Sequence, residues 1–98
     1  MSLETLPKEI LDDIELAKSI ILEAGAKEIY IFGSIANGQF SDESDLDIGI
    51  IGLEKKRFFQ VYGELISRLK RPVDIIGLDY NTEFSHQVKN EGIFIRVA

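Results

Sequence analysis

The sequence predicts a small α/β domain, on the border with the α+β class, in which helices flank a small mixed β-sheet. Two observations lead to this prediction. Amphipathic helical segments alternate with short apolar strands, and a full helix connects the second strand to the third. The chain has 98 residues and shows no internal repeat or linker, so residues 1–98 are expected to form a single domain.

The first element is expected to be a long amphipathic helix. Apolar residues at helical spacing predict that it covers Leu6–Ala24. Thr5 is the expected N-cap, and Pro7 lies in the first turn, where a proline is tolerated. Gly25 suits the position just after the last turn, which often has a left-handed backbone.

Four short segments rich in β-branched and aromatic residues are predicted to be strands. They are Lys27–Phe32, Asp45–Ile51, Val73–Gly77 and a short edge strand within Ile93–Val97. The segment Gly33–Gly38 predicts a turn or a short helix. About a dozen residues separate the first two strands, which is near the lower limit for a parallel crossover. A short helix followed by a loop could instead return the chain antiparallel.

The second half of the chain contains the clearest helical pattern. Glu54–Leu69 is predicted to be a helix, and it should end before Arg71, which precedes a proline. A helix of this length fits a right-handed crossover between parallel strands. Arg68, Lys70 and Arg71 lie near its C-terminus, where the helix dipole favours cations. A further short helix is expected over Thr82–Asn90.

Composition excludes several kinds of chemistry. The chain has no cysteine and a single histidine, His86, so disulfides, thiol nucleophiles and zinc sites built from Cys or His are excluded. Seventeen acidic residues face 11 basic ones, and a net charge of −6 argues against direct nucleic-acid binding. The acidic N-terminus resembles no targeting signal and no apolar run could span a membrane, so a cytoplasmic protein without membrane contact is expected.

Three aspartates form the candidate catalytic and metal-binding site. Asp45 and Asp47 stand two residues apart on one predicted strand, so their carboxylates point to the same face. A divalent cation such as Mg²⁺ or Mn²⁺ would relieve their mutual repulsion. Asp74 sits in an otherwise apolar strand and could join them if the two strands are neighbours. The alternatives are a solvated strand face and an Asp74 paired with a lysine or arginine.

The dipeptide Gly33-Ser34 follows the first strand directly and is the candidate nucleotide-binding element. A glycine allows the backbone to approach a ligand closely, and the following amides and the serine hydroxyl can donate hydrogen bonds to a triphosphate. The alternative is a plain turn between a strand and a helix, with Ser34 as its N-cap.

Taken together, these residues resemble the DNA polymerase β-like nucleotidyltransferase superfamily, and in particular its minimal nucleotidyltransferases, the MNT proteins. The segment GSIANGQFSDESDLDIGI, residues 33–50, is similar to the family pattern of a Gly-Ser pair, a second glycine, and a Ser-Asp-x-Asp strand start. The matching positions are Gly33, Ser34, Gly38, Ser44, Asp45, Asp47 and Asp74. The resemblance extends to most of the chain, in length and in the order of elements.

The resemblance implies a nucleotidyltransferase-like fold and nucleotidyl transfer assisted by two metal ions. Asp45 and Asp47 would bridge two Mg²⁺ ions, Asp74 would complete the ion on the acceptor side, and Gly33 and Ser34 would hold the phosphates of a nucleoside triphosphate. The implied reaction moves AMP from ATP to an acceptor hydroxyl. Proteins of this kind often accompany a helical HEPN protein, so the implied role is that of an antitoxin that adenylylates a tyrosine of a HEPN toxin.

One departure from the family pattern supports an alternative function. Many members carry an arginine just before the second glycine, and this chain has the neutral Asn37 there. An arginine at that position would help to neutralise phosphate charge. The alternative is therefore a binding subunit with weak or absent catalysis, which neutralises or completes a partner protein by occlusion.

Overall fold

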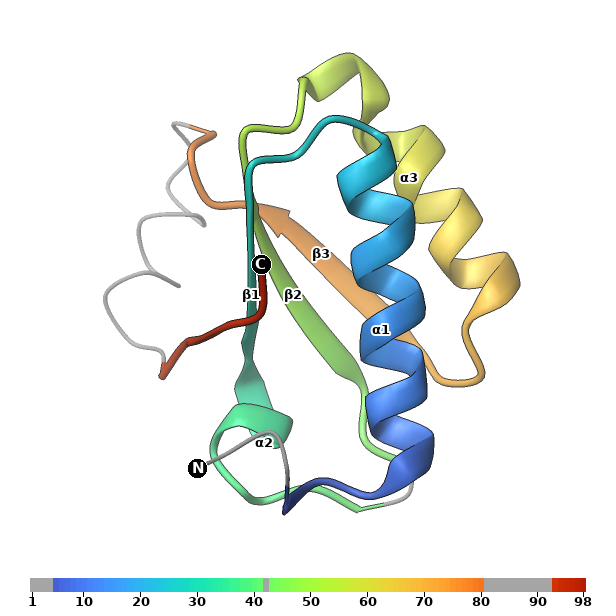
Figure 1. The fold of residues 1–98 in the computed structure, drawn as a ribbon, viewed down its shortest axis with the longest axis vertical. Helices are drawn as coiled ribbons and strands as arrows, with labels where there is room; N and C mark the ends of the chain where they lie inside the picture. The colour runs from blue at the N-terminus through green and yellow to red at the C-terminus, as the bar shows by residue number, and fades with distance from the viewer. Residues whose placement is uncertain (1–4, 42, 81–92) are drawn as a thin grey trace.

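The computed structural model describes residues 5–41, 43–80 and 93–98, which form a four-stranded sheet with its two long helices lying side by side against it (Figure 1). In chain order the elements are α1 (Lys8–Glu23), β1 (Glu28–Phe32), α2 (Gly33–Ala36), β2 (Leu46–Ile51), α3 (Lys55–Arg68), β3 (Val73–Gly77) and β4 (Ile95–Arg96). The predicted class, a small mixed sheet flanked by helices, is confirmed. The helix expected over 82–90 lies outside the described residues. Within them, no helix is long and apolar enough to cross a membrane.

The sheet has the strand order β3-β2-β1-β4, and its pairing answers the question that the sequence left open. β1 and β2 are antiparallel, whereas β2 and β3 are parallel. Between β1 and β2 the described residues form a single helical turn, α2, which is too short to carry the chain back across the sheet. Between β2 and β3 the long helix α3 makes the expected crossover. β4 is the expected short edge strand and pairs antiparallel with β1.

Alternation along the strands separates the sheet into two unlike faces. One face is apolar, covered by α1 and α3, and holds most of the core (Figure 1). The largest side chains with under 2% exposure are Ile10, Ile14, Ile21, Ile29, Ile31, Ile35, Leu46, Ile48, Ile50 and Leu65. Because successive strand residues alternate between faces, the polar residues between these isoleucines and leucines must point to the other face.

The two ends of α1 differ in how well the sequence predicted them. The predicted N-cap Thr5 is wrong: the helix begins at Lys8 and its N-cap is Pro7, whose carbonyl accepts the first helical hydrogen bonds. The residue before a proline is disfavoured in helical conformation, so the helix cannot extend back through Leu6. At the other end Gly25 has φ +104°, and the amides of Gly25 and Ala26 bond back into the last turn as predicted for a glycine-terminated helix.

Candidate active site

Two of the predicted aspartates lie directly opposite each other on neighbouring strands. Asp47 in β2 pairs in register with Asp74 in β3 and with Phe32 in β1. Residues opposite each other in a sheet present their side chains on the same face, so the two carboxylates share the face that the long helices leave uncovered. Asp45 precedes the first residue of β2 and is exposed at the rim of this group.

The electrostatics of this group are unfavourable for charge. The pKa of Asp47 is raised from 3.8 to about 6, first by burial and then by the negative charges of Asp74 and Asp45. Two causes therefore act together, because a half-buried carboxylate loses hydration and also faces two like charges. A carboxylate group arranged in this way is favourable for binding a cation, which would remove both penalties at once.

A cavity of about 320 Å³ lies over the opposed carboxylates. It is lined by Phe32, Asp47, Tyr62, Asp74, Ile75 and Ile76. The hydroxyl of Tyr62, on α3, donates a hydrogen bond of 2.8 Å to Oδ1 of Asp74. This hydrogen bond to a carboxylate raises the pKa of Tyr62. Among the described residues, the side chain bonded to Asp74 is therefore a tyrosine hydroxyl, and not the lysine or arginine that the sequence left as an alternative.

Gly33 stands against the aspartate pair. It has φ +75°, a left-handed conformation that favours glycine, and it is the first residue of α2, immediately after β1. A Cβ atom at Gly33 would collide with the carboxylate of Asp47 and lie 3.0 Å from its Cγ. Glycine is therefore needed here for two independent reasons. Ser34 follows in α2 and is half-buried. Of the two candidate nucleotide-binding residues, Gly33 is therefore the one that the structure sets against the carboxylate of Asp47.

The donor chemistry of the site fits a divalent cation of the Mg²⁺ or Mn²⁺ type, since carboxylate oxygens are the hard ligands that these ions prefer. The raised pKa of Asp47 follows from burial and from the charges of Asp74 and Asp45, and a bound cation would offset these effects. In residues 5–41, 43–80 and 93–98, no three histidine, cysteine or acidic side chains are grouped so that they could hold a metal ion. The opposed pair of Asp47 and Asp74 is thus the part of the donor set that the fold brings together.

One supporting interaction was not predicted. Asp13 of α1 is buried, and its Oδ2 accepts a hydrogen bond of 3.0 Å from Nε of Arg71, with side-chain exposures of 4% and 8%. Arg71 also donates from Nη1 to the carbonyl oxygen of Ser44, the residue before Asp45. The pair therefore connects α1 to the chain entering β2. The available signal was an aspartate within the apolar stripe of α1, between Ile10 and Ala17.

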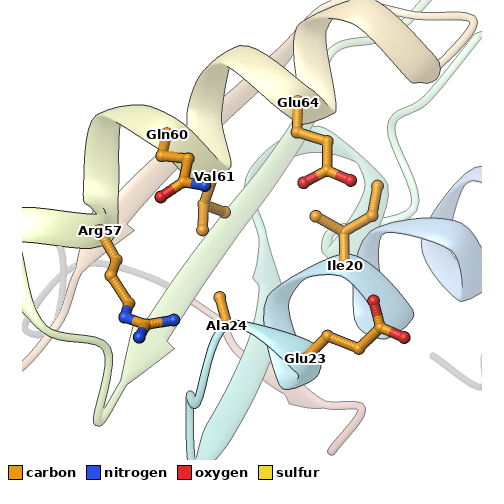
Figure 2. A pocket seen from close by; sticks show the side chains of 7 residues that line it. All are labelled: Ile20, Glu23, Ala24, Arg57, Gln60, Val61 and Glu64. Atoms are coloured by element: carbon orange, nitrogen blue, oxygen red, sulfur yellow. The ribbon is translucent and has the colours of Figure 1, made fainter.

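A second hollow, of about 160 Å³, lies between α1 and α3 (Figure 2). It is lined by Ile20, Glu23, Ala24, Arg57, Gln60, Val61 and Glu64. Figure 2 shows the side chains of Arg57 and Glu64 extending from α3 toward α1. Charges of both signs line this small space, between the helices that cover the apolar face of the sheet. None of the predicted site residues lines this second hollow. We assign the candidate active site to the cavity over Asp47 and Asp74, because two of the predicted carboxylates line it.

The fold and the site together define a class of protein. A small mixed sheet with helices on one face and opposed aspartates on the other is a nucleotidyltransferase-like architecture. The family model described as "Polymerase beta, Nucleotidyltransferase" matches residues 8–97, so this chain belongs to the polymerase β nucleotidyltransferase family.

Solved structures agree with this assignment. A protein described as a minimal nucleotidyltransferase is 28% identical, with a TM-score of 0.64 and 95% of each chain covered. A mutant of the toxin–antitoxin MntA–HpeT is 25% identical, with a TM-score of 0.57, 93% of this chain and 72% of that chain covered. A toxin–antitoxin structure with AMP-PNP, 23% identical, shares the fold with a TM-score of 0.63, 90% of this chain and 72% of that chain covered. No curated protein matches the chain.

Proposed function

We propose that this chain is a nucleotidyltransferase that uses Mg²⁺ to transfer AMP from ATP to a hydroxyl group, with a tyrosine of a helical HEPN-type toxin as its acceptor. The observation that carries the proposal is the opposed pair of Asp47 and Asp74, joined at its rim by Asp45. Membership of the polymerase β nucleotidyltransferase family supports the reaction class. Structural neighbours described as toxin–antitoxin complexes, one of them with AMP-PNP, support the partner and the nucleotide.

In this proposal each site residue has a distinct role. Asp47 and Asp74 would hold a divalent cation, with Asp45 joining them from the rim, and bound metal ions would stabilise the negative charge of the entering and leaving oxygens. Gly33 and Ser34 donate hydrogen bonds to the phosphates. The left-handed backbone of Gly33 brings this part of the chain close to Asp47, so the phosphates would lie near the metal-binding carboxylates. Asp74 lies on the acceptor side, since its Oδ1 already accepts a hydrogen bond from a hydroxyl.

Asn37 is the observation that favours the second candidate function, a binding subunit that neutralises its toxin by occlusion. Its side chain is exposed immediately after α2, beside the proposed phosphate-binding residues, and it brings no positive charge to them. The two candidates differ in one respect. Neutralisation by transfer requires the aspartates, whereas neutralisation by occlusion does not.

The test of the proposed function is a calorimetric titration of the full chain with Mg²⁺ and ATP. Wild type is compared with the Asp45→Asn/Asp47→Asn double variant, and Asp12→Asn serves as the control because Asp12 is an exposed carboxylate on α1. We expect metal-dependent ATP binding in wild type and in the control, and loss of binding in the double variant. Equal binding in all three proteins would contradict the proposed site.

The acceptor is tested by adding the partner toxin and ATP labelled at the α-phosphate. Label on a tyrosine of the toxin, absent with the double variant, is the expected result. If the double variant still neutralises the toxin and no label is transferred, neutralisation is by occlusion and the second candidate function holds.

A further inference from the structure

A hydroxyl of the chain itself contacts the aspartate that the proposed function places on the acceptor side. Oη of Tyr62 donates a hydrogen bond of 2.8 Å to Oδ1 of Asp74. The tyrosine side chain also lines the same cavity as Asp47 and Asp74. A hydroxyl bonded to a carboxylate in the reaction cavity has the ground-state geometry for general-base activation, because the proton lies on the path to its acceptor.

The ring of Tyr62 is held in position by its neighbours. It meets the ring of Phe58 edge to face, with centroids 6.1 Å apart and an interplanar angle of 84°. Both residues lie on α3, one helical turn apart, so the contact belongs to a continuous helix. The helix and the hydrogen bond to Asp74 therefore fix the phenol from both ends. A reacting group that is held in this way needs little further ordering before it reacts.

The other tyrosines have different surroundings. The chain contains three tyrosines in total, Tyr30, Tyr62 and Tyr80. Tyr30 donates to Oε1 of Glu28 over 2.6 Å, on β1, and Tyr80 donates to the carbonyl oxygen of Leu53 over 2.8 Å. Tyr62 is thus the tyrosine that contacts an aspartate of the candidate site. Tyr30 offers the same chemical pair, a phenol on a carboxylate, away from the cavity of Asp47 and Asp74.

We propose that Tyr62 is an internal acceptor, so that the chain adenylylates its own Tyr62 when it binds ATP. The inference rests on the proposed function and adds a modification site to it. Oη of Tyr62 forms a bond to the α-phosphorus of ATP, and the bond from that phosphorus to the oxygen bridging to the β-phosphate breaks. Pyrophosphate leaves with that oxygen. The phenolic proton passes to Asp74 and then to solvent, and the product is a phosphodiester between Tyr62 and adenosine.

Modification of Tyr62 has a consequence for the external acceptor. In the proposal, the hydroxyl of Tyr62 and the acceptor hydroxyl of the partner both bond to the same oxygen of Asp74. The partner and Tyr62 therefore compete for one position. The adduct would also fill the cavity that the reaction uses. We therefore expect self-modification to be fastest without a partner, and the modified chain to be a poorer enzyme toward its partner.

The experiment incubates the full chain with Mg²⁺ and ATP and measures intact mass, followed by peptide mapping. Wild type is expected to gain the mass of one adenylyl group on Tyr62, and to take label from ATP labelled at the α-phosphate but not at the γ-phosphate. Tyr62→Phe should lose the label, whereas the matched control Tyr30→Phe should keep it. The rate per molecule should not change on dilution, because donor and acceptor belong to the same chain.

ATP binding, measured by calorimetry for the same proteins, separates this inference from the proposed function. If wild type binds ATP and modifies its partner but carries no adduct on Tyr62, the inference is wrong and the proposed function stands. An adduct that persists in Tyr62→Phe also overturns the inference, because another residue is then the acceptor. If wild type binds no ATP with or without its partner, both proposals fall together.

Discussion

Asp13 is buried and Asp47 is half-buried, and the charges that surround these two carboxylates are opposite in sign. Asp13 is 3% exposed and accepts hydrogen bonds from Arg71 and from the backbone amide of Lys70. Asp47 is half-buried and faces Asp74 and Asp45, whose charges, together with burial, raise its pKa. One carboxylate is thus compensated by a cation of the chain, and the other is surrounded by like charge.

This difference separates structural from functional burial of charge. A buried carboxylate with its own arginine needs nothing from outside, and its removal chiefly affects folding. A buried carboxylate among carboxylates destabilises the free chain and is relieved only by a cation or a proton. The two aspartates therefore predict opposite effects of substitution. Four measurements can break or sharpen the comparison, beginning with the largest expected effect.

Asp13→Ala should have the largest effect on stability. Removal of the aspartate leaves the guanidinium of Arg71 buried without this counter-ion, which costs about 3–5 kcal/mol of the free energy of unfolding. Arg71 is also bonded to the carbonyl of Ser44, so the entry to β2 should loosen as well. Urea unfolding is the measurement, with the exposed Asp12→Ala as its control. A loss no larger than that of the control would show that the pair is not structurally important.

Gly33→Ala should damage the site more than the fold. Both Gly33 and Gly25 have positive φ, so alanine at either position costs about 1–2 kcal/mol in backbone strain. Only at Gly33 does the added Cβ collide with Asp47, since nothing lies within 4 Å of a Cβ at Gly25. We expect Gly33→Ala to lose ATP and Mg²⁺ binding in calorimetry, and Gly25→Ala to keep it. Equal binding by the two variants would remove Gly33 from the site.

Asp47→Asn should make the metal-free chain more stable at neutral pH. The folded-state pKa of Asp47, about 6, lies above its ordinary value of 3.8, so the folded chain holds the proton more tightly than the unfolded chain. The contribution of this group to stability is therefore greatest below about pH 4 and falls as pH rises through 6. Asparagine has no charge to lose and should remove this fall.

The measurement is urea unfolding of wild type and Asp47→Asn, without divalent cations, at about pH 5 and pH 7.5. The stability of the variant relative to wild type should increase between these two pH values. A difference that stays constant with pH would show that the fold does not disfavour the charged form of Asp47.

Glu64→Ala should have the smallest effect. Its ion pair with Arg68 on α3 measures 3.2 Å, but the two side chains are 46% and 52% exposed. Exposed pairs at this helical spacing contribute about 0.3–0.5 kcal/mol, so the variant should unfold almost as wild type does. A loss approaching that of Asp13→Ala would mean that exposure does not distinguish the ion pairs of this chain.

The sequence alone determined the elements and the identity of the candidate residues. Apolar periodicity located both long helices and three strands to within one or two residues, because each pattern reflects burial on one face. The edge strand was also found, although it proved shorter than the segment predicted. Two features of the candidate site could also be identified from the sequence, because they are local. They are the spacing of Asp45 and Asp47 and the glycine at position 33.

The tertiary structure alone decided what these residues meet. Three features depend on contacts between different elements of the chain. They are the antiparallel pairing of β1 with β2, the register that sets Asp47 opposite Asp74, and the hydrogen bond from Tyr62 to Asp74. The pair of Asp13 and Arg71 is separated by a still longer stretch of chain. Periodicity reports which face of an element is buried, but which elements become neighbours depends on how the whole core packs.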